Sequence, residues 1–234
     1  MTNMNYDNVL LEKIYKMYCS DFIGQNEICI KCQEYAKQQW YPLTNGPVPI
    51  FHIGKDFAKH DVKLLIVGKV AYGWNDYSDI WNNIFSGNQD SRTYMKNLIE
   101  ERVEELFYRR DEESDTVYFS FLNKSLTAIF GNVDDAFNRI AITNFVHCND
   151  GNVNDYLRQK NRYYCASKVT NGFIHKEIEI LNPSHILVLT NTIQGKYERY
   201  LKDENLNVKF IEHPSSPGRT ISGFTEDIKS FIEL

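Results

Sequence analysis

Four of the five cysteines fall into two pairs whose spacing is typical of a thiolate metal site. Cys29 and Cys32 form a C-x2-C pair near the start of the chain, and Cys148 and Cys165 follow far downstream, after an apolar segment. Thiolates are soft ligands, and four of them suit zinc or a [4Fe-4S] cluster better than a hard cation. We therefore predict one metal centre that joins distant parts of the chain. The alternative is burial as small apolar residues, which we expect for Cys19 unless it replaces one of the four.

A second group of polar and aromatic side chains follows three apolar segments. It covers residues 68–74, 143–148 and 212–219, which contain an amide, imidazoles, hydroxyls, a guanidinium and large aromatic rings. In an open α/β sheet, ligands bind beyond the carboxyl ends of the strands, where such loops converge. We therefore expect these three segments to form one ligand site.

The apolar segments themselves are typical of parallel strands. Each is a nearly continuous apolar run rather than an alternating one, as expected of strands that are covered on both faces. The runs are residues 62–68, 139–146, 185–189 and 208–211. Helical patterns fall on residues 5–18, on a stretch from the C-x2-C pair to residue 38, and on 91–110, 119–130, 167–181, 191–201 and 221–234. This order predicts a three-layer α/β/α fold with a central four-stranded parallel sheet.

The composition indicates a single domain over residues 1–234. With 42% apolar residues in a chain of 234, a full core can form, and no Gly-, Ser- or Pro-rich linker divides the chain. No apolar segment reaches the roughly 20 residues of a membrane span, and the first residues lack the pattern of a signal peptide. The odd number of cysteines argues against a disulfide framework. We expect a cytoplasmic monomer without a membrane contact.

The charge restricts where nucleic acid could bind. A net charge of −5 does not favour general binding to nucleic acid, so any such surface must be local. Arg158, Lys160 and Arg162 lie between the third and fourth cysteines, with Tyr156 before them and Tyr163 and Tyr164 after them, and form one candidate surface. The alternative for this segment is a solvated charged loop.

Several short motifs follow one another in a specific order. The C-x2-C pair comes first, a glycine-led loop begins at Gly68, and Ile142-Thr143-Asn144 leads to Cys148, with Cys165 after 16 further residues. The segment 182–189, NPSHILVL, is then similar to a P-x-x-I-V-x-L strand, and His213-Pro214-Ser215 forms a late H-P-S loop. This ordered set resembles the uracil-DNA glycosylase superfamily, and most closely its iron-sulfur branch, family 4. The resemblance covers Cys29 to Arg219.

The resemblance implies two catalytic residues and a cofactor. Asn144 would hydrogen-bond the Watson-Crick edge of an extruded base, because an amide supplies one donor and one acceptor to match a pyrimidine. His213 would donate a hydrogen bond to O2 of the departing base and so stabilise its anion. The four cysteines would hold a [4Fe-4S] cluster rather than the alternative, a structural zinc.

The resemblance also implies residues that bind the base and the DNA. Gly68 leads the first loop, in which Tyr72 would close the pocket against a 5-methyl group. Trp74 or Trp81 would stack on the base. Ser215 and the backbone of the 214–218 loop would hold a DNA phosphate, with Arg219 near the DNA backbone. The implied partner is DNA, single-stranded or uracil-containing.

The first motif departs from that of the active branches. Their loop carries an acidic residue at its second or third place, where this chain has Lys69 and Val70, and the customary proline is Ala71. The enzyme interpretation is a DNA repair glycosylase that excises uracil or another deaminated base by hydrolysis. The alternative is an inactive nucleic-acid or nucleotide-binding module of the same fold. An enzyme acting on free nucleosides is less favoured, because the loop at 215–219 suits a phosphate.

Overall fold

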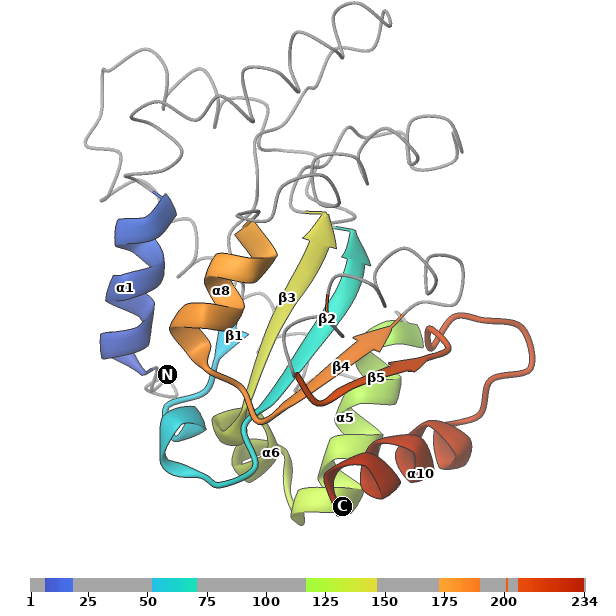
Figure 1. The fold of residues 1–234 in the computed structure, drawn as a ribbon. Coiled ribbons are helices and arrows are strands. Elements are labelled where there is room, and N and C mark those ends of the chain that lie inside the picture. Colours follow the sequence, from blue (N-terminus) through green and yellow to red (C-terminus); the bar gives the residue numbers. More distant parts are fainter. Residues whose placement is uncertain are drawn as a thin grey trace, which may run out of the picture.

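The structure is a computed structural model that describes residues 7–18, 52–70, 117–146, 173–189, 201 and 206–233. Their elements, in order, are α1 (Asn8–Tyr18), β1 (His52–Ile53), the 3-10 helix η2 (Phe57–Lys59), β2 (Leu64–Val70), α5 (Val117–Phe130), α6 (Val133–Arg139), β3 (Ile140–Val146), α8 (Phe173–Leu181), β4 (His185–Leu189), β5 (Val208–Ile211) and α10 (Ile221–Ile232) (Figure 1). Strands and helices alternate along most of this order. The described chain therefore has an α/β fold.

The sheet is mixed and has five strands in the order β1-β3-β2-β4-β5. The four predicted strands are all present and run parallel, so that part of the prediction is confirmed. The prediction of a purely parallel, four-stranded sheet is wrong, because β1 adds an antiparallel edge strand that pairs His52 with Ile142 and Ile53 with Ala141. A strand of two residues in a Pro- and Gly-rich segment is too short to produce an apolar run, so its sequence carried no strand signal.

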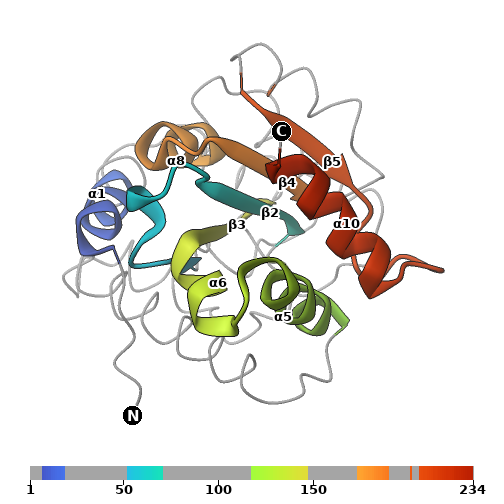
Figure 2. The same ribbon diagram turned by 90° about the horizontal axis from the view of Figure 1, so that it is seen from below.

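Both faces of the sheet are buried. On one face, alternate strand residues join residues of α5, α6 and α10 in a single apolar core: Leu64, Ile66, Ile140, Ile142, Leu187, Leu189 and Ile211 from the strands, and Leu122, Leu126, Ala136, Phe137, Phe224, Ile228 and Phe231 from the helices. The intervening residues of β2, β3 and β4 are buried as well. Figure 2 shows α5, α6 and α10 on one side of the sheet and α8, with α1 beside it, on the other. Burial on both faces explains the continuous apolar runs.

Most predicted helices that fall on described residues are confirmed. These are α1, α5, α8 from Phe173 onward, and α10, which ends at Ile232. α8 ends where Asn182 adopts a positive φ of 45° and donates its backbone N–H to Ile178 O, directly before a proline. The predicted helices at 91–110, after the C-x2-C pair, and over most of 191–201 lie outside the described residues. No helix within the described ranges is long and apolar enough to cross a bilayer.

The short helix α6 was not predicted, although its start has a clear signal. Asn132 is the N-cap, and its side-chain oxygen accepts a hydrogen bond from the backbone N–H of Asp135 at 2.8 Å. Asp134 and Asp135 then place negative charge in the first turn, where the helix dipole favours it. Because α6 runs directly into β3, the apolar residues of both elements merge into one segment of sequence.

Candidate functional site

Gly68 and Asn144 lie side by side at the carboxyl edge of the sheet. They are partners in the parallel register of β2 and β3, and the side chain of Asn144 is buried. A Cβ atom on Gly68 would lie 2.3 Å from Asn144 Oδ1, so the asparagine amide occupies the space above the glycine. Only glycine at this position permits that placement of the amide. The structure thus brings together two of the residues selected from the sequence.

The strand that carries Asn144, β3, is anchored by a hydrogen bond to α8. The side chain before it, Thr143, points to α8 and donates its hydroxyl to Glu177 Oε2 at 2.7 Å. Both Thr143 and Glu177 are fully buried, at 0% exposure. Because neighbouring residues of a strand point to opposite faces, this contact directs Asn144 to the face covered by α5, α6 and α10.

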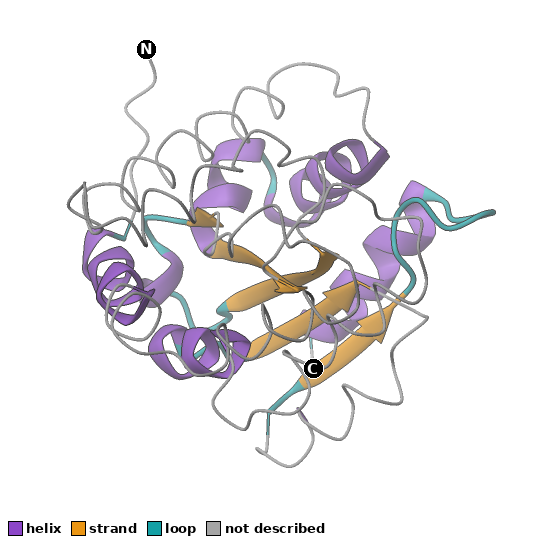
Figure 3. Ribbon diagram, turned by 90° about the horizontal axis from the view of Figure 1, so that it is seen from above, coloured by secondary structure: helices purple, strands orange, loops and turns teal. Residues whose placement is uncertain are grey.

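The topology predicts a ligand crevice next to these residues. The chain passes from β2 to its neighbour β3 on one side, and later from β4 to β5 on the other side. The connections therefore diverge between β2 and β4, and in open α/β sheets ligands bind beyond the carboxyl ends at such a point. Gly68 lies beside this crevice on β2, with Asn144 one strand further out. Figure 3 looks onto this edge of the strands, with helices on both sides of the sheet.

His213 lies on the opposite flank of the crevice, just beyond the end of β5. Its ring is stacked on that of Tyr118, in the first turn of α5, with 5.5 Å between centroids and 20° between planes. This contact places His213 on the same side of the sheet as Asn144. Asn144 on β3 and His213 beyond β5 therefore lie on the same face of the sheet, with β2 and β4 between them.

The hydrogen bonds of His213 define the chemical form of its ring. The backbone N–H of Ser215 donates to His213 Nδ1 at 3.2 Å, and the Ser215 hydroxyl lies 2.6 Å from the same atom. An amide N–H can only donate, so Nδ1 must accept and cannot carry the proton of the imidazole. The ring is therefore neutral with its proton on Nε2, and the hydroxyl is a second donor to Nδ1. The N–H donor of His213 is thus at Nε2.

Two successive tight turns build the loop that carries His213. Ser216 N donates to His213 O at 2.9 Å, and Arg219 N donates to Ser216 O at 3.1 Å. Proline occupies the second position of each turn, and Gly218, at the third position of the second turn, has a φ of 78°, the arrangement of a type II turn. The backbone N–H groups of Ser215, Ser216 and Arg219 are used within the loop, so phosphate binding by this loop stays a prediction.

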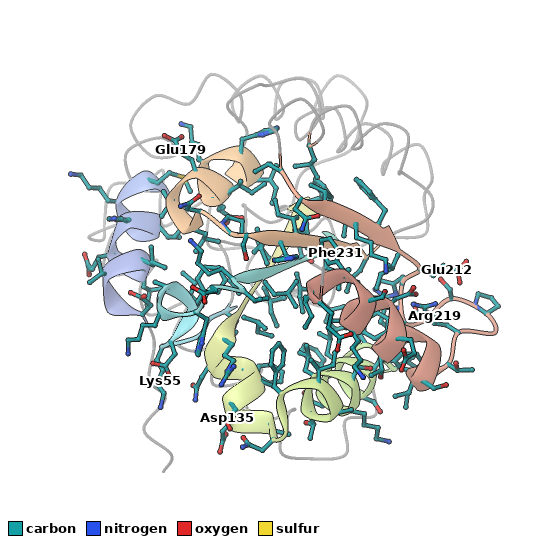
Figure 4. The ribbon with its side chains drawn as sticks, turned by 60° about the horizontal axis from the view of Figure 1, so that its bottom comes forward. Lys55, Asp135, Glu179, Glu212, Arg219 and Phe231 are labelled. Atoms are coloured by element: carbon teal, nitrogen blue, oxygen red, sulfur yellow. The ribbon has the colours of Figure 1, made fainter. Side chains whose placement is uncertain are left out.

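Arg219 attaches the end of the loop to α10. Its guanidinium forms an ion pair with Asp227 and lies over the ring of Phe224 at 5.5 Å. Lys209 of β5 donates to the Asp227 carbonyl at 2.7 Å and lies 3.7 Å from its carboxylate. Figure 4 shows Arg219 where the loop joins α10. The side chain of Arg219 is only 13% exposed, so the structure gives it a structural role, and its contact with DNA stays a prediction.

Tyr118 is a residue of this region that the sequence did not reveal. Its hydroxyl is buried, and within the described chain it has no hydrogen-bond partner. Burial raises the pKa of the Tyr118 phenol, because the charged phenolate would lose its hydration. The predicted helix began at residue 119, two residues after the start of α5 at Val117, and no local pattern linked this tyrosine to a histidine so distant in sequence.

The other predicted site residues lie outside the described residues. They are Cys29, Cys32, Cys148 and Cys165 of the metal centre and Tyr72 and Trp74 of the first loop. Within the described ranges no three His, Cys, Asp or Glu side chains form a group that could hold a metal ion. The metal centre therefore stays a prediction from the sequence.

Comparisons with known proteins assign no family. No protein-family model matches the chain, and no curated protein sequence matches it. The functional argument below therefore depends on the residues and on their geometry.

Proposed function

We propose that this chain is a uracil-DNA glycosylase-like protein, a single three-layer α/β/α domain that binds DNA and excises uracil or another deaminated base. The observation that carries the proposal is the placement of an amide and a neutral imidazole N–H donor on one face of the sheet, on the two flanks of the crevice. Three strand spacings separate β3 from β5, or roughly 14 Å between backbones. That separation accommodates a pyrimidine ring with a hydrogen-bonding side chain on each edge.

Asn144 is the base-reading residue of this mechanism. Its amide N–H donates to O4 of the flipped pyrimidine, and its oxygen accepts from N3–H. Cytosine offers the opposite donor and acceptor pattern at these atoms. Gly68 has no side chain, so the amide of Asn144 can lie against its Cα position. Gly68 thereby supports the orientation of the amide on which this selectivity depends.

His213 is the leaving-group residue. As the bond between C1′ of the sugar and N1 of the base breaks, its electron pair moves into the base, and negative charge develops on O2. The Nε2–H of His213 donates to O2 and stabilises this charge, because the two hydrogen bonds from Ser215 to Nδ1 keep the donor proton on Nε2. A water molecule then bonds to C1′ of the oxocarbenium-like sugar and releases its proton to solvent.

The test of this function is excision from defined DNA. Purified protein is incubated with end-labelled single- and double-stranded oligonucleotides that contain one uracil, and alkali then cleaves any abasic site. We expect a strand break at the uracil and none in the thymine control. Intact strands after long incubation at excess protein would contradict the enzymatic proposal.

One observation favours the rival, a binding module without catalysis. β2 runs through Val70, which pairs with Val146 of β3, so positions 69 and 70 belong to a strand. These are the positions at which active branches carry a water-positioning acid, and this chain has no carboxylate there. The rival predicts binding to uracil- or abasic-site DNA, measured by fluorescence anisotropy, without a strand break after alkali.

We expect the purified protein to be brown, with a broad visible absorbance and four irons per chain. The reason is the spacing of Cys29, Cys32, Cys148 and Cys165, combined with a reducing intracellular compartment, in which thiolates persist as ligands. Cys148→Ser should abolish the colour, and Cys19→Ser is the matched control that should retain it. Colourless protein that contains one zinc would contradict the cluster and leave the four-thiolate site in place.

Gly68→Ala should slow uracil excision about 10-fold or more, because displacing a positioned group by about 1 Å is enough for such a loss. The new Cβ would lie 2.3 Å from Asn144 Oδ1, and the asparagine side chain must rotate away. Since the displaced atom is the end of a side chain, the free energy of unfolding should change by about 1 kcal/mol or less. Single-turnover excision and urea unfolding measure the two effects. Unchanged excision by a folded variant would show that the position of Asn144 is not critical.

A further inference from the structure

The ring of Tyr118 is stacked on the ring of His213. The two ring planes are 20° apart and their centroids are separated by 5.5 Å, which is offset stacking rather than an edge contact. Phe119 meets the tyrosine ring edge-on, at 90°. Tyr118 therefore occupies one face of the imidazole.

α5 holds Tyr118 rigidly with respect to the sheet. Leu122 and Leu126, one and two turns further along the helix, are fully buried in the core that contains the strands. Thr225 of α10 also donates its hydroxyl to Ser125 at 2.8 Å, which joins α5 to the helix that follows the His213 loop. The backbone that carries the tyrosine ring is thus anchored to the core on which the sheet packs.

The contacts from Ser215 alone do not define the orientation of the imidazole. Both of its donors act on a single atom, Nδ1, and two hydrogen bonds to one atom do not by themselves fix the tilt of the ring about that point. Tilting would move Nε2, on the far side of the ring, away from its target. The ring of Tyr118 against one face of the imidazole limits this tilt.

We propose that Tyr118 is a positioning residue that holds the imidazole plane of His213 and so directs its Nε2–H into the crevice. This inference rests on the proposed function and extends it to a residue outside the recognised motifs. The role belongs to the aromatic ring and not to the hydroxyl. The hydroxyl is buried without a hydrogen-bond partner among the described residues, and burial raises its pKa, so it stays protonated and makes no bond there that holds His213.

The experiment compares Tyr118→Leu with Tyr118→Phe in the full chain. Leucine removes the ring, and we expect kcat for uracil release to fall about 10-fold or more while KM changes little, because the position of Nε2 matters most as charge develops on the base. Phenylalanine keeps the ring, so kcat should stay within about twofold of wild type and the stability should be equal or higher. Phe121→Leu is the matched control, since Phe121 lies on α5 but packs on Phe224.

Nuclear magnetic resonance of His213 provides a readout that does not depend on activity. Stacking on Tyr118 should shift the imidazole carbon-bound protons upfield, and this shift should disappear in Tyr118→Leu and persist in Tyr118→Phe and Phe121→Leu. A ring current that survives in Tyr118→Leu would overturn the contact itself. Its loss without a fall in kcat would overturn the positioning role, and an equal fall in Tyr118→Phe would assign the role to the hydroxyl instead. If wild-type protein releases no base, the proposed function fails, and the resonance shifts alone decide whether Tyr118 orients His213.

Discussion

His213→Ala is expected to lower the rate of uracil excision about 10²- to 10³-fold, the loss typical of removing one preorganised donor at a developing anion. The expectation follows from the geometry of the loop. Nδ1 accepts from the backbone N–H of Ser215, so the ring presents a neutral Nε2–H donor before substrate arrives. The hydrogen bond from Nε2–H to O2 of the base strengthens most when negative charge develops on O2. Loss of this donor should therefore lower kcat far more than the affinity for DNA.

The measurement is single-turnover excision from a uracil-containing strand, with anisotropy as the parallel measure of binding. His60→Ala is the matched control: it also removes an imidazole, but His60 precedes β2 and so lies towards the amino edge of the sheet. The control should excise uracil at the wild-type rate. Similar rates for His213→Ala and wild type would remove His213 from the reaction and leave the α/β fold as the supported conclusion.

Gly54→Ala should be the most destabilising single-methyl substitution among the described glycines. Its Cβ would lie 2.3 Å from Phe137 O and 2.4 Å from the carbonyl carbon and oxygen of Asn138. All three are backbone atoms at the junction of α6 and β3, so none of them can rotate away as a side-chain atom would. We expect a loss of about 3 kcal/mol in the free energy of unfolding, the upper part of the usual range for overpacking. For a chain of this size, that corresponds to a fall in Tm of roughly 10 °C.

The hydrogen bonds around Gly54 explain why the chain cannot adjust at low cost. Gly54 N donates to Ile140 O, and Asp56 N donates to Asn138 O, both at 2.9 Å. Moving the strand away would break the attachment of β1 to the sheet. Gly68→Ala is the matched control, because its Cβ would meet a neighbour at the same distance of 2.3 Å, but that neighbour is a side-chain oxygen. Urea unfolding measures both variants, and equal losses would contradict the distinction between backbone and side-chain neighbours.

Local sequence patterns predicted most of the described fold. The four parallel strands carry continuous apolar runs because residues such as Ile66 and Val67 are both buried, although they point to opposite faces. α1 and α10 carry a helical apolar pattern because only one side of each is buried. β1 was missed because two residues hold no pattern, and α6 was missed because it runs into β3 without an intervening turn.

The candidate site was predicted less completely, and the reason is the distance in sequence between its parts. Residue types, motif order and the family resemblance that they support selected Asn144, Gly68, His213 and Ser215. The register of β2 with β3 put the asparagine amide over the glycine, and the turn after β5 gave His213 its Nε2–H form. The stacking of Tyr118 on His213 depends on how α5 packs against the sheet, which no neighbouring residue in the chain records. Sequence by itself determined which local elements form and which chemical groups are available, since these depend on near neighbours. Only the tertiary structure decided which groups meet, because strand register and helix packing depend on contacts across the whole core.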